Sequence, residues 1–227
     1  MKIIVTGSSS GLGKSLYQKF KSNGHNVIGI SRSESSTTDL LCDLSRLEEV
    51  NFTFNSVSKE NDVIDYLFLN AGVLGKINKA NEINQSDLID ALQINVLSNK
   101  AILDTLINHK VTIKNVIAIS SGASNKAYDG WLMYCLSKSA LNQLIRCYAI
   151  ENKDTHFLSL APGIMQTKMQ DLIVQYDSNK FSSIEKFKSL YGYNDAPDKI
   201  AHKIFMNLER FSSIESGRFF DLRDIHD

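Results

Sequence analysis

Apolar and polar residues alternate along this chain with two different periods. Short, continuous apolar runs predict strands at residues 3–6, 27–31, 64–70, 115–120, 156–161 and 218–221. Longer segments, with an apolar residue every three or four positions, predict helices at 13–23, 86–108, 132–152 and 197–211, and a weaker one at 46–58. Because apolar strands alternate with helices, we expect a parallel sheet covered on both faces. The connection rules then predict an α/β Rossmann fold, with a doubly wound parallel sheet.

The length of 227 residues fits a single domain that spans residues 1–227. Residues 164–194 have weaker periodicity than the rest, and we expect them to cover one end of the sheet as a substrate-covering segment. In open parallel sheets, ligands bind beyond the carboxyl ends of the strands. The functional residues should therefore lie just after each strand.

Composition excludes several classes of partner. The formal net charge is zero, so no basic excess is present to neutralise a nucleic acid or an acidic membrane surface. No apolar run is long enough to span a membrane, and the chain enters a strand at once, so we expect no signal peptide. Three cysteines without a CxxC spacing favour a reducing cytoplasmic location. The five histidines form no ligand pattern, and we predict no metal site.

A glycine-rich turn follows the first strand, in the sequence "TGSSSGLGKSL". Gly7, Gly11 and Gly13 permit positive φ angles and a close approach of the backbone. The helix that begins there would present free N–H groups and the positive end of its dipole to a phosphate. The alternative is a tight turn that binds no ligand. The position directly after the first strand favours a phosphate site.

The spacing TGxxxGxG resembles that of the short-chain dehydrogenase/reductase family. In nicotinamide sites an acidic residue near the end of the second strand accepts hydrogen bonds from the ribose, but here Ser31 and Arg32 stand at that point. A guanidinium can clamp a 2′-phosphate, which a carboxylate would repel. We therefore predict NADP(H) as the cofactor. The alternative for Arg32 is a solvated side chain at the start of a loop.

Further motifs extend the resemblance over essentially the whole chain. Asp43 in "CDLS" matches an adenine-contacting aspartate, although it could instead cap a helix. The sequence "LNAG" corresponds to the family's NNAG, with Leu69 in place of the first asparagine, and "APGIMQT" matches a segment that contacts the nicotinamide. The resemblance implies a cofactor site made of Gly7, Ser9, Ser10, Gly11, Leu12, Gly13, Ser31, Arg32, Asp43, Leu44, Asn70, Ala71, Gly72, Tyr134, Lys138, Pro162, Gly163 and Thr167.

The pattern Tyr-x-x-x-Lys occurs three times, beginning at Tyr17, Tyr134 and Tyr176. We expect Tyr17 on the surface of its helix and Tyr176 in the irregular segment. Only Tyr134 has a serine thirteen residues upstream, Ser121, just past the end of a strand. Four residues separate Tyr134 from Lys138, so the two side chains share one helix face. This spacing is the one seen in the family.

The family resemblance adds Asn95 in "LQINVLS", and it implies a catalytic set of Asn95, Ser121, Tyr134 and Lys138. Tyr134 would supply a proton to a substrate oxygen, and the Lys138 ammonium would lower the tyrosine pKa and hold the nicotinamide ribose. Ser121 would hydrogen-bond the substrate oxygen. Asn95 would support a water that relays protons. The alternative for Asn95 is a solvent-facing residue of an apolar helix.

Two segments resemble the sepiapterin reductase and bacterial benzil reductase branch of the family, namely "GWLMYCLSK" and "APGIMQTKMQ". Trp131 is then either a wall of the substrate site or a core residue. Asp221 in "GRFFDLRD" matches an aspartate that anchors a pterin, which would make it a substrate residue. Its alternative is a strand-end aspartate paired with Arg218 or Arg223.

These observations predict an NADP(H)-dependent oxidoreductase that reduces the carbonyl of a small ring-bearing or dicarbonyl substrate. The alternatives are a 3-oxoacyl or sugar-type substrate, and a non-catalytic protein that senses the cofactor. The complete set of four catalytic positions favours an enzyme. We expect a small-molecule carbonyl partner, no nucleic acid or membrane partner, and a homodimer or homotetramer.

Overall fold

The computed structural model describes residues 1–225. Its centre is a seven-stranded parallel sheet in the order β3-β2-β1-β4-β5-β6-β7. The chain order reverses between β1 and β4, which is where a doubly wound sheet binds its ligand. The strands are β1 Lys2–Thr6, β2 Asn26–Ser31, β3 Leu40–Leu41, β4 Val63–Leu69, β5 Thr112–Ile119, β6 His156–Ala161 and β7 Arg218–Asp221. The predicted doubly wound Rossmann fold is confirmed.

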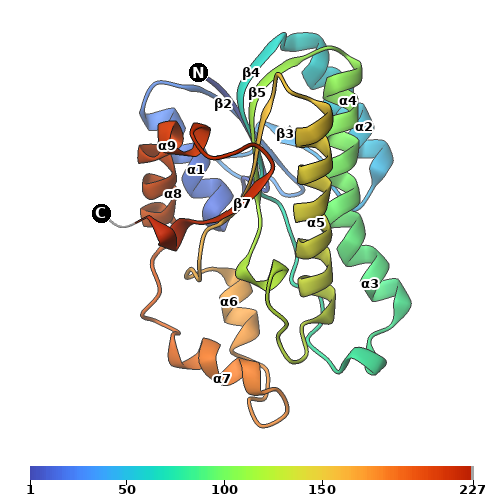
Figure 1. The fold of residues 1–227 in the computed structure, drawn as a ribbon, viewed down its shortest axis with the longest axis vertical. Helices are drawn as coiled ribbons and strands as arrows, with labels where there is room; N and C mark the ends of the chain where they lie inside the picture. The colour runs from blue at the N-terminus through green and yellow to red at the C-terminus, as the bar shows by residue number, and fades with distance from the viewer. Residues whose placement is uncertain (226–227) are drawn as a thin grey trace.

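Helices cover both faces of this sheet (Figure 1). One face packs against α1 Gly11–Ser22, α8 Pro197–Met206 and α9 Leu208–Ser212. The other packs against α2 Leu47–Glu60, α4 Ser98–Asn108 and α5 Leu132–Glu151. Both layers bury continuous apolar clusters, in which Phe20 and Phe54 are fully buried. The central strands are therefore apolar on both sides, as a parallel sheet requires.

The structure departs from the predicted elements at three places. Strand β3 was not predicted, because two residues are too short to show a period. The helix expected at 86–108 is α3 Gln85–Leu92, then a π-helical turn Gln93–Leu97, then α4. The helix expected at 197–211 divides into α8 and α9, because Asn207 leaves the helical conformation between them. The apolar period of the sequence continues through the π-helical turn and through Asn207, so it did not reveal either interruption.

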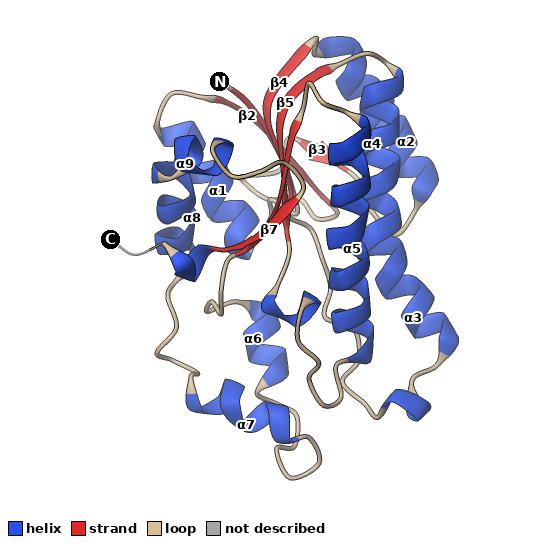
Figure 2. Cartoon of the chain, in the orientation of Figure 1, coloured by secondary structure: helices blue, strands red, loops and turns tan. Residues whose placement is uncertain are grey.

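Residues 164–194 lie beyond the carboxyl ends of the strands, below the sheet in Figure 2. They form α6 Lys168–Ile173 and α7 Ser182–Ser189, joined by turns. Short 3₁₀ turns also occur at η1 Ala80–Glu82, η3 Gly122–Ser124 and η4 Leu222–Asp224. Within residues 1–225, no helix is long and apolar enough to cross a membrane.

Candidate active site

The turn after β1 has the geometry of a phosphate cradle. Gly7 and Gly11 have φ angles of +70° and +53°, in the left-handed region that favours glycine. Gly13 differs from the expectation, since it lies inside α1 without a positive φ. A Cβ at Gly13 would stand 2.2 Å from the Gly7 carbonyl oxygen, so glycine is required there for close packing alone. The helix start is thereby held tightly against the turn.

Two side chains join this turn to the end of β4. The Asn70 Nδ2 donates to the Thr6 carbonyl at 2.8 Å, and the Asn70 main-chain N–H donates to the Thr6 hydroxyl at 3.0 Å. Ser10, the N-cap of α1, makes no side-chain capping bond. The first N–H groups of a helix have no partner within it, so those of α1 are oriented to bind an anion. This cradle fits the pyrophosphate of a dinucleotide.

The loop after β2 presents Arg32. The neighbouring Ser31 is buried, and its hydroxyl donates to the Ser33 carbonyl at 2.7 Å, which fixes the start of the loop. Arg32 itself is exposed. A guanidinium on a fixed, exposed loop can reach a phosphate on an adjacent ribose.

Asp43 stands across from this loop, and its Oδ1 accepts from both the Ser45 N–H and the Ser45 hydroxyl. Burial alone would raise the pKa of the Asp43 carboxyl, but the Ser45 hydrogen bonds and the nearby Arg32 lower it below its usual value. The N-cap of α2 is Arg46, so Asp43 forms a turn before the helix and does not cap it.

A single cavity of about 590 Å³ joins these loops to α5 and to the covering segment. Of the predicted site residues, all except Gly13, Asn95 and Asp221 line it. It therefore brings together residues from the ends of β1, β2, β4, β5 and β6. Such a volume suits a small-molecule ligand site.

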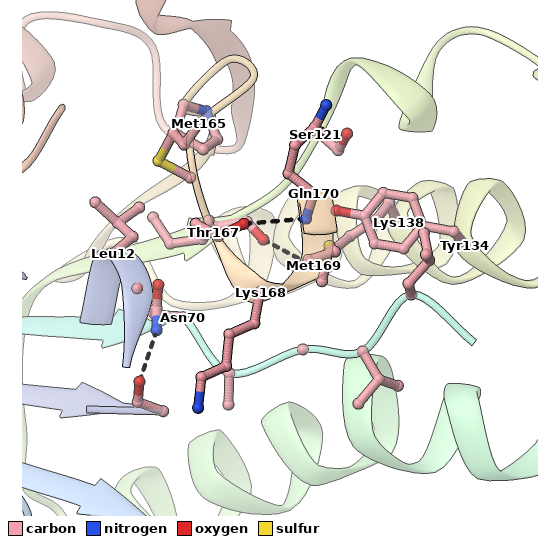
Figure 3. Close-up of a pocket in the computed structure, with 18 of the residues that line it drawn as sticks. Leu12, Asn70, Ser121, Tyr134, Lys138, Met165, Thr167, Lys168, Met169 and Gln170 are labelled. Atoms are coloured by element: carbon pink, nitrogen blue, oxygen red, sulfur yellow. Dashed lines mark hydrogen bonds between the residues drawn. The ribbon is translucent and has the colours of Figure 1, made fainter. Parts of the chain in front are cut away.

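Tyr134 and Lys138 project from α5 into this cavity, close to Ser121, while Leu12 and Asn70 lie toward the opposite side (Figure 3). The Lys138 Nζ donates to the Ile119 carbonyl at 2.7 Å and lies 5.8 Å from the centroid of the Tyr134 ring. The Ser121 hydroxyl accepts from the Ala123 N–H at 3.2 Å. The tyrosine, lysine and serine are thus assembled by α5 and by the end of β5.

Burial dominates the electrostatics of this group. It raises the pKa of Tyr134 to about 12, against a smaller lowering by the hydrogen bond with Ser121. Burial also lowers the pKa of Lys138 to about 8. Burial of the phenol thus raises the pKa of Tyr134 above its ordinary value, where the sequence predicted a lowering by Lys138. Tyr134 remains a protonated phenol at neutral pH.

Asn95 lies in the π-helical turn and is fully buried, which excludes the solvent-facing alternative. Its side-chain amide accepts from the Val73 N–H at 2.8 Å and donates to the Val73 carbonyl at 2.9 Å. A Cβ added to Gly72 would lie 3.2 Å from the Asn95 Oδ1 and 3.3 Å from the Lys138 Nζ. Asn95 therefore lies close to Lys138 and holds the loop after β4 at Val73. It does not line the cavity itself.

An aromatic wall closes the other side of the cavity. Trp131 is buried, stacks on Phe187 with ring centroids 4.7 Å apart, and meets Tyr134 edge-on at 5.9 Å. Phe187 comes from α7, and the buried Gln170 holds it by donating to the Phe187 carbonyl at 3.0 Å. Trp131 packs in a core cluster, as its core interpretation predicts, and it also lines the cavity, so a role as a wall of the substrate site stays a prediction.

Asp221 does not face the cavity. Both of its carboxylate oxygens accept from the Arg223 guanidinium, at 2.9 Å from Nε and 2.6 Å from Nη2. Arg223 lines the cavity in its place. The expectation of a substrate-anchoring carboxylate is therefore not met by this geometry, and the ion-paired alternative is the one observed.

The other two Tyr-x-x-x-Lys pairs lie outside the cavity. Tyr17 is buried, contrary to the expected surface position, and its hydroxyl donates to Asp39 at 3.3 Å. Tyr176 lies in the covering segment, and its hydroxyl accepts from the Ile77 N–H at 3.4 Å.

Several lining residues were not predicted from the sequence. They come from the loop after β4, the π-helical turn, the loop before α5, the covering segment and the 3₁₀ turn η4. The additional lining residues include Val73, Leu74, Ile94, Tyr128, Ile164, Met165, Lys168, Met169, Leu172, Ile173, Lys186, Phe187 and Arg223. For the covering segment, the sequence offered two signals, namely its weak periodicity and the motif "APGIMQTKMQ", which contains Ile164, Met165, Lys168 and Met169. Within residues 1–225, no cluster of His, Cys, Asp and Glu could hold a metal ion.

Comparisons with known proteins agree with this arrangement. Residues 1–177 match the family model of short chain dehydrogenases. The chain is 31% identical to benzil reductase ((S)-benzoin forming) of Bacillus subtilis, over 97% of this chain and 98% of that protein. It is 30% identical to the sepiapterin reductase of Rattus norvegicus, over 70% of this chain and 63% of that protein. A solved short chain dehydrogenase/reductase from Saccharomyces cerevisiae superposes with a TM-score of 0.86 at 26% identity, covering 98% of this chain and 96% of the other.

The chain belongs to the short chain dehydrogenase/reductase family. It is an oxidoreductase that acts on CH–OH or C=O groups, and its family uses a nicotinamide cofactor, NAD(H) or NADP(H).

Proposed function

We propose that this protein is an NADPH-dependent carbonyl reductase of small ring-bearing or dicarbonyl substrates, with Tyr134 as the general acid. One observation carries the proposal. A single cavity runs from the glycine-rich cradle to Tyr134, Lys138 and Ser121, with an aromatic wall beside the tyrosine. A cofactor and a ring-bearing ketone would thus meet at the phenol.

The cradle residues support a dinucleotide at the first end of the cavity. The α1 N-terminus with Gly7 and Gly11 would hold the pyrophosphate, Asp43 the adenine side, and Arg32 a 2′-phosphate. Asn70 and the segment Pro162–Thr167 would flank the nicotinamide. When bound, the reduced nicotinamide supplies the hydride that the carbonyl carbon receives.

The residues of α5 and β5 then handle the proton. Tyr134, whose pKa is about 12, holds its proton at neutral pH and would donate it to the substrate oxygen. The Ser121 hydroxyl would donate a hydrogen bond to the same oxygen as negative charge develops. The Lys138 ammonium stabilises the phenolate left behind, while Asn95 holds the Val73 loop that backs this lysine.

The aromatic wall and the relatives both support the substrate class. Trp131 and Phe187 offer a flat apolar surface beside Tyr134, which suits a ring. Two of the relatives above carry the names benzil reductase and sepiapterin reductase, which denote a diketone and a ring-bearing ketone. A 3-oxoacyl or sugar-type substrate remains the alternative class, because the substrate end of this fold is built from loops.

We also propose a reducing cytoplasmic setting and a homodimer or homotetramer. The three cysteines form no disulfide with one another, which supports a reducing compartment. Exposed apolar side chains on α5, Leu136 and Ile150, support burial against another copy of the chain. Size-exclusion chromatography with light scattering would measure the assembly directly.

The test is a panel of carbonyl compounds with NADPH and then NADH, followed by the loss of cofactor absorbance. The panel contains benzil, a pterin ketone, a 3-oxoacyl thioester and an aldose. We expect turnover of benzil-type diketones with NADPH and much slower turnover with NADH. Preferred use of the thioester or the sugar would overturn the substrate class, and equal use of the two cofactors would overturn the cofactor assignment.

A further inference from the structure

The substrate end of the cavity carries positive charge only. Six lysine, arginine and aspartate side chains line the cavity as a whole. Asp43 is the one aspartate among them, and it lies at the cofactor end near Arg32. The remaining four are Lys138, Lys186 and Arg223, and Lys168, which also lies beside the cradle residues Ser10 and Gly11. Among the described residues, neither Lys168 nor Lys186 forms an ion pair. The charged side chains that line this end are therefore all basic, and the Asp221 carboxylate that pairs with Arg223 offsets part of that charge.

Arg223 is the member of this group with a fixed position. Its Nε and Nη2 donate to the two oxygens of Asp221, and its main-chain N–H donates to the Asp221 Oδ1 at 3.0 Å. This pairing with Asp221 raises the pKa of Arg223. Burial opposes ionisation of Asp221, but the bonds from Arg223 outweigh it and lower the pKa of that carboxyl. Both shifts favour the ionised forms of the pair.

The fork of Arg223 retains free donors despite this pairing. A guanidinium has five N–H donors, and the side-chain bonds to Asp221 use two of them. The side chain of Arg223 is 61% exposed, whereas that of Asp221 is only 15% exposed. Asp221 thus fixes the orientation of the guanidinium, and Arg223 keeps N–H donors that can bind a ligand.

Arg223 also lies close to the catalytic group. Its Nη2 is 3.8 Å from the position that a Cβ would take at Gly122, the residue after Ser121. Its Cδ is 3.4 Å from the corresponding position at Gly163, which follows β6. The guanidinium therefore lies beside Gly122, the neighbour of the residue proposed to hold the substrate oxygen.

We infer that Arg223, positioned by Asp221, is a substrate-binding residue that selects carbonyl compounds carrying a carboxylate next to the reacting carbonyl. This inference rests on the proposed carbonyl reduction at Tyr134, and it narrows the substrate class to aryl 2-oxo acids. The aromatic wall takes the ring, Ser121 and Tyr134 take the ketone oxygen, and Arg223 takes the carboxylate. A carboxylate suits a guanidinium because it accepts charge-assisted hydrogen bonds in one plane.

The experiment compares benzoylformate with its methyl ester, which has the same ring and ketone but no charge. Both binding and turnover are measured. Trp131 is the single tryptophan of the chain and lies in the cavity wall, so its fluorescence reports binding without any reaction. With NADP⁺ bound, so that no hydride is available, we expect benzoylformate to bind more tightly than the ester. With NADPH, we expect benzoylformate to be reduced with the higher kcat/KM.

Arg223→Gln should lower the preference for the acid over the ester about ten- to a hundredfold, in binding and in kcat/KM. Arg223→Lys should restore part of the preference, since it keeps the charge. The control is Arg218→Gln, because Arg218 is exposed on β7 and does not line the cavity. It should leave the preference unchanged.

Two results would overturn the role of Arg223. One is a wild-type protein that binds and reduces the ester but not benzoylformate, and the other is an Arg223→Gln preference equal to that of the wild type. If the proposed carbonyl reduction itself is wrong, no carbonyl of the panel will oxidise NADPH. The fluorescence titration would still show whether the protein binds benzoylformate more tightly than its ester, so the two failures can be distinguished.

Discussion

The two ends of the cavity are built in different ways. At the cofactor end, main-chain groups and short polar side chains fix the loops at the strand ends, as Asn70 does with Thr6 and Ser31 with Ser33. At the substrate end, Trp131 stacks on Phe187, and α7 reaches the site only through the covering segment. The first end depends on backbone geometry, and the second depends on packing between distant segments. Substitutions at the substrate end should therefore leave cofactor binding intact, and substitutions at the cofactor end should leave the substrate end intact.

The largest effect should come from Tyr134→Phe. Losing the hydroxyl removes the proton donor, so kcat for carbonyl reduction should fall about a hundred- to ten-thousandfold. The NADPH dissociation constant should stay nearly constant, because the ring keeps its packing against Trp131. Steady-state kinetics and a fluorescence titration of NADPH measure the two quantities.

Tyr193→Phe is the matched control, since Tyr193 is 88% exposed and lies outside the cavity. Tyr17→Phe would be a poorer control, because Tyr17 bonds to Asp39, which in turn accepts from the Gly29 N–H of β2. A Tyr134→Phe rate within roughly twofold of the wild type would remove the tyrosine from the mechanism.

Arg32→Ala tests the cofactor end. Losing a charge-assisted phosphate contact should weaken NADPH binding about ten- to a hundredfold and leave NADH binding almost unchanged. Fluorescence titrations with both cofactors give the ratio. Arg210→Ala, an exposed arginine on α9, is the control and should change neither affinity. An equal loss for NADPH and NADH would contradict the 2′-phosphate contact.

Lys138→Met should inactivate the protein and also stabilise it. Burial lowers the pKa of Lys138 to about 8, so below that pH the folded state carries an unfavourable buried charge worth about 3 kcal/mol. The Ile119 carbonyl loses its donor in the variant, which offsets about 1 kcal/mol. We expect the free energy of unfolding to rise by about 2 kcal/mol at pH 7.

The pH dependence gives this effect its sign. Below about pH 8 the lysine is protonated in both states and its penalty is complete. Between about pH 8 and the ordinary lysine pKa, only the unfolded chain keeps the proton, so wild-type stability rises with pH relative to Lys138→Met. Urea unfolding at pH 7 and pH 9.5 compares the two proteins. A gap that widens with pH would show that desolvation does not control this lysine.

Phe187→Leu should give the smallest effect. The substitution removes an aromatic stacking pair worth about 0.5–1.5 kcal/mol, so KM for a ring-bearing ketone should rise about two- to tenfold. NADPH affinity should not change, because Phe187 lies at the far end from the cradle. Phe52→Leu is the control, since Phe52 is exposed on α2. If NADPH affinity changed as much as KM, the cofactor end and the substrate end would not be independent.

The same contrast explains what could be predicted from the sequence. Gly7, Gly11 and Gly13 serve local backbone geometry, so their spacing identified the cradle before the fold was known. Asn70 was found through the resemblance of "LNAG" to the family motif. Tyr134, Lys138 and Ser121 were found because a helix spacing and a strand end bring them together. The periodicity also located all the strands but the two-residue β3.

Other features depend on contacts that sequence spacing does not encode. Phe187 meets Trp131 across more than fifty residues of chain, and only folding of the covering segment creates that stack. For Asp221 the sequence left open a substrate anchor and a pair with Arg218 or Arg223, and only the structure shows that Arg223 takes both of its oxygens. The pKa of Tyr134 was expected to fall, and burial raises it, because desolvation depends on everything packed around the phenol.

The most direct test of two separable ends in one cavity is the double variant Arg32→Ala/Tyr134→Phe, compared with each single variant. The two measurements are the NADPH dissociation constant and the single-turnover rate of benzil reduction at saturating NADPH. We predict that the double variant has the affinity of Arg32→Ala and the rate of Tyr134→Phe, because the two sites share no contacts. A Tyr134→Phe protein that binds NADPH tenfold more weakly, or an Arg32→Ala protein whose saturated rate falls tenfold, would contradict the account.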